Sequence, residues 1–246
     1  MRELLVVDLG SLPYAAALEL QRDVARRRIT GEIAEDVLLL VEHPPVVTLG
    51  RTAKGSNLIA SPDFLASHGV ELFEVERGGD ITFHGPGQLV GYPVIDLKRH
   101  RKDLHWYLRQ VEEALIQAID VFGIAGGRVD KYTGVWVEAD RDSRRKIASI
   151  GVHARDWVTW HGFALNVNTD LRYFDLIVPC GIAGVTMTSV ARELRQGAAD
   201  IRAVANEVTG AFGRVFDLTP RSLEPTRLQH LGVAAVAVDS VAARSS

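Results

Sequence analysis

The sequence of 246 residues contains a single cysteine, Cys180, and this scarcity excludes a disulfide within the chain. A lone thiol is commonly a small buried hydrophobic residue. It acts as a nucleophile only where a positive neighbour lowers its pKa and a ligand can reach it. Pro179 and Gly181 constrain the backbone on either side of this thiol. Position alone therefore leaves two interpretations open, a core residue or a nucleophile.

Long apolar runs and an excess of basic residues are also absent. No stretch approaches the roughly 20 apolar residues that a membrane span needs, and the apolar run near the start is too short for a signal peptide. The formal net charge of −3 lacks the basic excess typical of nucleic-acid-binding domains. We therefore expect a cytoplasmic protein with neither membrane nor nucleic acid as its partner.

Histidine and charge are present but scattered. His43, His84, His153 and His161 lack the spacing of metal ligands, and with no second cysteine we expect no metal site. Two basic clusters occur at residues 98–102 and 141–146. They fit either solvated loops or a docking patch for an acidic partner.

The hydrophobic pattern predicts one domain that is richer in strands than in helices. A composition of 47% hydrophobic and 24% charged residues suffices for one sizeable core. Apolar positions at helical spacing predict helices over 14–28, 103–122 and 200–216, and Ser61 and Pro62 begin a short helix that stops near Gly69. Strands are predicted over 4–9, 37–41, 46–49, 70–75, 133–138, 146–153 and 158–167.

These elements do not alternate regularly, which favours an α/β (α+β) fold with a mixed, largely antiparallel sheet packed with helices. After Pro220 the apolar residues show no convincing helical or strand period. We expect a domain over residues 1–220 and a loosely ordered C-terminal tail over 221–246.

A glycine-rich segment over residues 77–93 is the first candidate for a ligand site. Five glycines and two prolines stand between two apolar runs, and glycine lets a backbone approach a ligand closely. The segment has neither the Gly-Lys-Ser/Thr ending of a phosphate loop nor a Gly-x-Gly-x-x-Gly opening a helix. The alternative interpretation is a β-hairpin with two bulges.

Two strand-like segments carry further polar residues. Lys146 enters a run of small and apolar residues, where a lysine either extends to solvent or faces a partner that needs a cation, such as a thiolate. The segment 160–168 contains His161 and Gly162, and this glycine opens space on one face of the strand.

Four segments together resemble the signature of the octanoyltransferases, also called the lipoate-protein ligase B family. They are Arg-Gly-Gly-Asp-Ile-Thr-Phe-His-Gly-Pro-Gly-Gln at 77–88, Lys-Ile-Ala-Ser-Ile-Gly at 146–151, His-Gly-Phe-Ala-Leu-Asn at 161–166 and Pro-Cys-Gly-Ile at 179–182. They occur in the family's order with similar gaps, and the resemblance spans about residues 1–215. Four ordered segments are far more specific than any one of them.

The resemblance implies the catalytic fold of biotin and lipoate ligases and an acyltransferase that needs no cofactor. Such enzymes move an octanoyl group from octanoyl-acyl carrier protein to a lysine of lipoyl domains in 2-oxoacid dehydrogenases and of the glycine cleavage H protein. The acyl-thioester nucleophile carries over to Cys180, and the lysine that tunes it to Lys146. The residues that the resemblance implies in substrate binding are Arg77, Gly78, Gly79, Asp80, Ile81, Thr82, Phe83, His84, Ala148, Ser149, Ile150, His161, Gly162 and Phe163.

The chemistry of these groups fits a two-step acyl transfer. A nearby ammonium favours the thiolate of Cys180, and Lys146 is also suited to shuttle the proton of the target lysine. The oxyanion needs fixed donors, for which the backbone amides of 78–82 and of 146–150 are both candidates.

Three other functions remain open at this point. An ATP-dependent lipoate or biotin ligase with the same fold needs no cysteine. A non-catalytic module that binds an acyl carrier uses the glycine-rich segment only as scaffold. A cysteine hydrolase usually pairs its thiol with histidine, for which His153 and His161 are the candidates.

Overall fold

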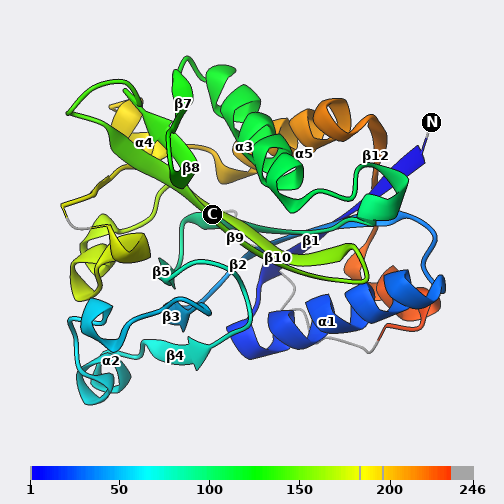
Figure 1. Cartoon of the computed structure of the whole chain (residues 1–246), viewed down its shortest axis with the longest axis horizontal. Helices are drawn as coiled ribbons and strands as arrows, with labels where there is room; N and C mark the ends of the chain where they lie inside the picture. The colour runs from blue at the N-terminus through cyan, green and yellow to red at the C-terminus, as the bar shows by residue number, and fades with distance from the viewer. Residues whose placement is uncertain (1, 183, 196, 234–246) are drawn as a thin grey trace, which may run out of the picture.

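The computed structural model describes residues 2–182, 184–195 and 197–233. Within these residues a nine-stranded sheet forms the centre of the molecule, and its strands run mostly antiparallel (Figure 1). In spatial order they are β12 (Leu218–Ser222), β1 (Arg2–Ser11), β2 (Asp36–Glu42), β6 (Gln88–Val94), β10 (Val158–Asn166), β9 (Arg145–Arg155), β8 (Tyr132–Val137) and β7 (Gly126–Val129), with β11 (Thr186–Met187) also paired to β9. The parallel pairs are β12–β1, β1–β2 and β11–β9, so the predicted mixed, largely antiparallel sheet is confirmed.

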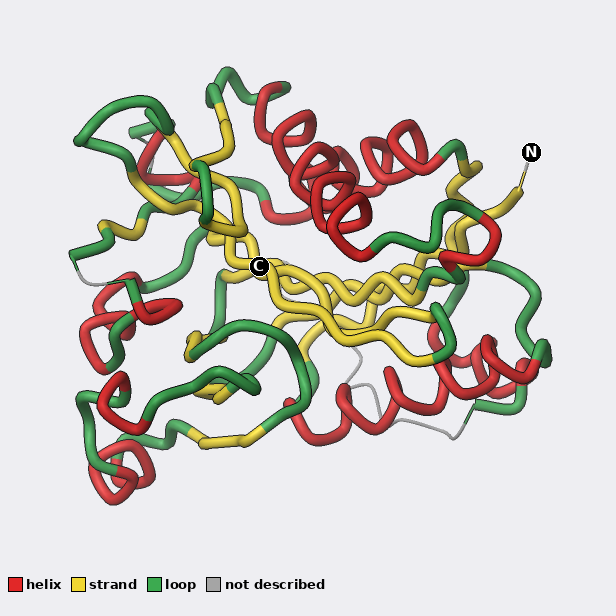
Figure 2. The backbone as a smooth tube through the Cα atoms, in the orientation of Figure 1, coloured by secondary structure: helices red, strands yellow, loops and turns green. Residues whose placement is uncertain are grey.

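Helices cover both faces of this sheet (Figure 2). On one face lie α3 (Leu104–Asp120) and α5 (Ile201–Phe216), and on the other lies α1 (Tyr14–Thr30). Successive residues of β1 point to opposite faces, so that Leu4 packs beneath α3 and α5 whereas Leu5 packs against α1. Burial on both faces explains why the central strands read as continuous apolar runs.

Side-chain caps begin three of the four predicted helices, whereas α1 starts after Pro13 without one. The side chain of Asp103 accepts a hydrogen bond from the amide of Trp106 at 3.0 Å at the start of α3, and Asp200 accepts from the amides of Arg202 and Ala203 at the start of α5. Ser61 caps α2 (Pro62–Ser67) in the same way. No helix among the described residues is both long and apolar enough to cross a bilayer.

A second, three-stranded sheet with the order β4-β3-β5 lies beside the first within the described residues. Its strands are β3 (Val46–Leu49), β4 (Glu71–Glu74) and β5 (Ile81–His84). The interpretation of the glycine-rich segment as a hairpin is therefore wrong, since β5 pairs with β3 and the following β6 pairs with β2 and β10. The segment instead carries the chain from one sheet to the other.

The strands β5 and β6 were expected only in the hairpin interpretation of the glycine-rich segment. The other elements that were not predicted are η1 (Gly55–Asn57), η2 (Leu97–Arg99), η3 (Leu171–Leu176), η4 (Pro179–Gly181), α4 (Val190–Glu193), η5 (Pro225–Leu231) and the strands β7, β11 and β12.

The structure corrects the expectation of a loose tail from residue 221 for the residues up to 233. Strand β12 pairs with β1, and the amide of Leu223 donates to the carbonyl of Val6 at 2.8 Å. Leu223, Leu228 and Val233 are buried against the α1 face of the sheet. The sequence hid this packing because three isolated apolar residues show no period; residues 234–246 of the predicted tail lie outside the described residues.

Candidate active site

Cys180 lies on a tight turn where the two sheets meet. It occupies the middle of η4 with a left-handed backbone, φ 55° and ψ 18°, and Gly181 follows with φ 66°. A left-handed conformation is strained for a residue with a side chain, and here Pro179 before it and the glycine after it allow the turn. The thiol is half-buried, at the wall of a cavity.

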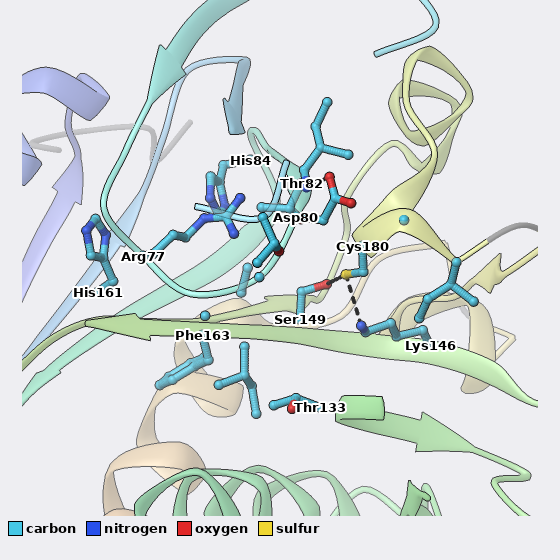
Figure 3. Close-up of a pocket in the computed structure, with 18 of the residues that line it drawn as sticks. Arg77, Asp80, Thr82, His84, Thr133, Lys146, Ser149, His161, Phe163 and Cys180 are labelled. Carbon is cyan, nitrogen blue, oxygen red and sulfur yellow. Dashed lines mark hydrogen bonds between the residues drawn. The ribbon is translucent and has the colours of Figure 1, made fainter. Parts of the chain in front are cut away.

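The amine of Lys146 stands beside this thiol (Figure 3). Lys146 lies on β9, its side chain is buried, and its Nζ donates a hydrogen bond to Cys180 Sγ over 3.0 Å. Burial by itself raises the pKa of the thiol, but the charge and hydrogen bond of Lys146 and the hydroxyl of Ser149 at 3.8 Å more than offset it, so that the pKa lies below its usual value. The arrangement favours a thiolate.

The cavity has a volume of about 450 Å³, which is within the usual range for small-molecule sites. Besides Cys180 and Lys146, the predicted binding residues that line it are Arg77, Gly79, Asp80, Ile81, Thr82, His84, Ser149, Ile150, His161, Gly162 and Phe163. The structure thus brings four separate sequence segments to one cavity.

Three predicted residues do not line the cavity. The amide of Gly78 donates to the carbonyl of Val152 at 2.8 Å and so attaches the glycine-rich segment to β9. The ring of Phe83 stacks on that of Tyr173 in the core beneath the small sheet. Ala148 is buried within the sheet. These residues support the walls.

Arg77 places a buried positive charge on one wall. Its guanidinium donates to the carbonyl and the hydroxyl of Thr48 and to the carbonyl of Gly78, and none of its partners in the described part of the chain is a carboxylate. Burial lowers the pKa of Arg77 from its high ordinary value. Its charge is also among the influences that lower the pKa of Cys180.

Asp80 braces the turn that carries the thiol. One carboxylate oxygen accepts a hydrogen bond from Asn57 Nδ2 at 2.6 Å, and the other accepts from the amide of Ile81 at 2.8 Å. A Cβ atom on Gly181 would lie only 2.5 Å from Asp80 Oδ2. Close approach therefore requires glycine at 181, in addition to its positive φ.

The histidines lie away from the thiol. His161 Nε2 is buried, has no hydrogen-bond partner among the described residues and lies 3.7 Å from Glu76 Oε1, while His153 Nδ1 contacts the carbonyl of Glu76. Burial lowers the pKa of both rings, and it lowers that of His84 to about 3. In the described residues Cys180 has hydrogen-bond contacts with Lys146 and Ser149 only, which does not favour a cysteine–histidine hydrolase.

Several residues of the cavity wall were not predicted from the sequence. Tyr14 fitted the apolar stripe of its helix, yet its ring lines the cavity, and burial raises the pKa of its hydroxyl to about 12. Tyr92 lies within the buried strand β6, and no sequence signal separates it from core residues. Further wall residues include Thr52, Lys54, Asn57, Lys131, Tyr132, Thr133 and Ile182.

Comparisons with known proteins agree with this geometry. Residues 13–213 match the family described as lipoyl protein ligase A/B catalytic domain. An octanoyltransferase from Solibacter usitatus is 48% identical over 217 residues, covering 88% of this chain and 94% of the relative. One from Rubrobacter xylanophilus is 51% identical over 208 residues, covering 84% and 90%.

A solved structure shares the fold. The bipartite lipoate protein ligase from Thermoplasma acidophilum, studied together with its E2 lipoyl domain, superposes with a TM-score of 0.74 and 16% sequence identity, covering 91% of this chain and 88% of that one. At this identity the likeness concerns the fold alone.

The fold and the thiol beside an amine therefore define an enzyme of the lipoate-ligase fold class. The chain belongs to the lipoyl protein ligase A/B catalytic domain family, within which its curated relatives are octanoyltransferases. It is an acyltransferase of that kind.

Proposed function

We propose that this enzyme moves an octanoyl group from octanoyl-acyl carrier protein to a lysine of lipoyl domains, through a thioester on Cys180. The observation that carries the proposal is the contact of 3.0 Å between Lys146 Nζ and Cys180 Sγ at the wall of a cavity. The expected acceptors are the lipoyl domains of 2-oxoacid dehydrogenases and the glycine cleavage H protein. A cytoplasmic location remains a prediction.

The first step forms the acyl-enzyme. The Cys180 thiolate attacks the carbonyl carbon of the carrier thioester, and the new carbon–sulfur bond turns the carbonyl oxygen into an oxyanion. Collapse breaks the bond to the carrier's sulfur, which leaves as a thiol after taking a proton from the Lys146 ammonium. The products are octanoyl-Cys180, neutral Lys146 and the free carrier thiol.

The oxyanion requires a donor on the cavity wall, and Thr82 is our candidate. Two of the amides predicted for this role are engaged, that of Gly78 with Val152 and that of Ile81 with Asp80, and the strand 146–150 lies between two paired strands. The hydroxyl of Thr82 is buried on the cavity wall and has no hydrogen-bond partner in the described part of the chain. An unpaired buried donor is stabilised by an anion that forms next to it.

The second step returns the enzyme to its starting state. The amine of the target lysine attacks the thioester and passes a proton to neutral Lys146. Collapse of the intermediate releases the Cys180 thiolate and the octanoylated lysine, so Lys146 is again an ammonium beside a thiolate.

The cavity also supplies binding energy for the acyl chain. Burying the methylenes of an octanoyl group contributes roughly 5 kcal/mol at about 0.8 kcal/mol each. Phe163, Ala164 and Val90 provide apolar wall for it. Two methylenes more or fewer change the binding by about 1.6 kcal/mol, roughly fifteenfold, so we expect a chain-length preference rather than strict selection.

Intact mass spectrometry tests the proposal directly. The enzyme is mixed with octanoyl-acyl carrier protein without ATP. We expect one octanoyl adduct on the wild type, none on Cys180→Ala, and transfer of the adduct when a lipoyl domain is added. An adduct that persists on Cys180→Ala, or transfer that requires ATP and Mg²⁺, would contradict the proposal, and the latter would indicate a ligase.

A further inference from the structure

A buried carboxylate on α3 lies behind the catalytic strand and has no part in the two steps above. The side chain of Glu112 is fully buried, and its Oε2 accepts hydrogen bonds from Arg109 at 2.7 Å and from Arg128 at 3.1 Å. Its other oxygen, Oε1, accepts from the backbone amide of Gly134 at 3.0 Å. The carboxylate is thus held by two arginines and itself holds one point of the backbone of β8.

That point of β8 is pressed against the side chain of Lys146. Gly134 has φ 132°, a conformation that residues with a side chain rarely adopt. A Cβ atom there would lie 2.6 Å from the carbonyl oxygen of Ala148, 2.8 Å from Lys146 Cε and 3.3 Å from Lys146 Nζ. The ladder between β8 and β9 is irregular just after this position, between Val135 and Trp136.

The same strand supplies the next contact of the amine. Lys146 Nζ lies 5.3 Å from the ring centre of Trp136, within the range of a cation–π interaction. Gly134 and Trp136 are two residues apart on β8, so they lie on the same face of the strand. Both are in contact range of the lysine. The path of the lysine towards Cys180 is therefore bounded by β8, and Glu112 contacts the backbone of β8 at Gly134.

We propose that Glu112 and Gly134 are positioning residues, which hold the Lys146 amine at the Cys180 sulfur from behind the active site. Neither residue touches the substrate: Gly134 leaves the space through which the lysine passes, and Glu112 keeps the glycine backbone in place. The inference deepens the proposed function, because the coupling between amine and thiol is what makes the thiol reactive.

The first test substitutes the glycine. Gly134→Ala adds a Cβ atom only 2.8 Å from Lys146 Cε, so the side chain of Lys146 must shift and its amine moves away from the sulfur. We measure the alkylation rate of the single thiol by iodoacetamide between pH 5 and 10, a readout that needs no acyl substrate. The pH midpoint should move upward by about one unit, because removal of a neighbouring positive charge shifts a pKa by about that amount or more.

The second test removes the acceptors of Glu112 in two steps. Glu112→Gln keeps one acceptor oxygen, for which the Gly134 amide and two arginines compete, whereas Glu112→Ala keeps none. The alanine variant should shift the alkylation midpoint in the direction of Gly134→Ala, and the glutamine variant should shift it less. Glu113→Gln is the matched control, since Glu113 is the adjacent residue on α3 and also accepts from Arg128, but its other hydrogen bond comes from Gln117 and not from the backbone of β8.

The outcomes are distinguishable from a purely structural role. A structural role lowers the melting temperature of the variants but leaves the alkylation midpoint of the folded protein unchanged, and that result in Glu112→Ala would overturn the inference. If Gly134→Ala does not fold, the pair Glu112→Gln and Glu112→Ala decides alone. Should Cys180→Ala still transfer octanoyl groups, the proposed function fails while the coupling measured by alkylation stands.

Discussion

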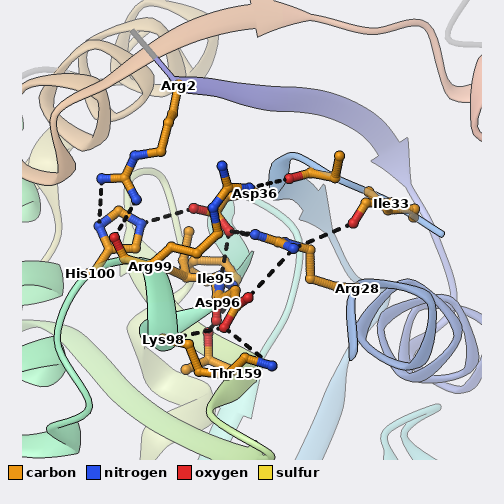
Figure 4. Close-up of polar contacts among 12 residues, drawn as sticks. Arg2, Arg28, Ile33, Asp36, Ile95, Asp96, Lys98, Arg99, His100 and Thr159 are labelled. Carbon is orange, nitrogen blue, oxygen red and sulfur yellow. Dashed lines mark hydrogen bonds and ion pairs between the residues drawn. The ribbon is translucent and has the colours of Figure 1, made fainter. Parts of the chain in front are cut away.

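Two clusters of buried charged groups lie in different parts of the main sheet, and they differ in whether their hydrogen bonds are complete. In the first, which we call the Asp36 cluster, Arg28, Asp36, Asp96 and His100 join α1 to the strands β2 and β6 and the segment that follows (Figure 4). Asp36 Oδ1 accepts from Arg28 and from the amide of Asp96, and Oδ2 contacts His100 Nε2 at 2.9 Å. Both carboxylate oxygens of Asp36 are therefore satisfied.

In the second cluster, around Cys180, the hydrogen bonds are incomplete within the described part of the chain. The thiol has one strong partner, Lys146, and faces a cavity whose wall includes the hydroxyl of Thr82, which has no hydrogen-bond partner among the residues that the structure describes. The guanidinium of Arg77 is buried there with neutral partners. A closed cluster stabilises the fold, while an open one keeps binding capacity for a substrate. Buried charge alone does not identify a site, but buried charge with unused capacity at a cavity does.

The largest expected effect is on catalysis and comes from Lys146→Ala. Removal of the ammonium leaves the burial of Cys180 unchanged, so the pKa of the thiol rises and the alkylation profile moves to higher pH. Formation of the octanoyl adduct at pH 7 should slow by about 10²-fold or more, the usual size of a lost acid–base group. Rapid-quench mass spectrometry measures the rate of adduct formation. An unchanged alkylation profile in the folded variant would mean that the lysine does not tune the thiol.

The reverse pattern is expected for Asp36→Ala. This change leaves Arg28 buried without its main partner, which typically destabilises a protein by about 3–5 kcal/mol. Acyl transfer per folded molecule should remain as in the wild type, because Asp36 contacts no wall of the cavity. Urea unfolding together with the transfer assay at low temperature measures both. A selective loss of transfer without loss of stability would contradict the distinction between the two clusters.

The Asp36 cluster also predicts how stability depends on pH. Burial raises the pKa of Asp36, but the hydrogen bonds from His100 and the Asp96 amide and the charge of Arg28 outweigh it and lower the pKa. Its contribution is therefore complete above the unfolded value near 3.9 and is lost as the pH falls through the folded value. Asp36→Asn should remove this part of the acid sensitivity in urea titrations below pH 5, and an identical pH dependence in both proteins would exclude it.

The smallest effect is expected on the carrier contact. Of the turn predicted to dock an acidic partner, Arg145 is engaged with Glu138 and Glu193, whereas Arg144 is exposed and Arg141, although 3.9 Å from Glu138, is exposed too. Replacing Arg141 and Arg144 by Gln should lower kcat/KM for the carrier a few-fold at low salt, and the difference should shrink as salt screens the charges. Arg155→Gln, at the other end of β9, is the control. An equal loss in that variant would place the contact elsewhere.

The sequence predicted those parts of the fold that depend on local pattern. The apolar stripes of the long helices, together with Ser61 and Pro62 at the start of α2, were sufficient to predict the helices. Strand partners depend on contacts between distant segments. For this reason the hairpin interpretation failed at β5, and the packing of Leu223 on the sheet was missed.

The site shows a similar division. The resemblance identified the thiol and the lysine that the structure places together, because four ordered motifs carry that information. It did not separate wall residues from supporting ones: Thr82 and His84 face the cavity, while Phe83 between them packs into the core beneath the small sheet. The pairing of β5 with β3 decides which residues of β5 face the cavity and which face the core. The sequence of neither strand indicates which strand it pairs with.

The left-handed backbone at Cys180 has a consequence for the balance between stability and activity. A residue with a side chain in this conformation costs about 1 kcal/mol, which glycine does not incur. Cys180→Gly should therefore melt at a higher temperature than Cys180→Ala, although both are inactive. The enzyme keeps its nucleophile at a position where selection for thermal stability alone would favour glycine.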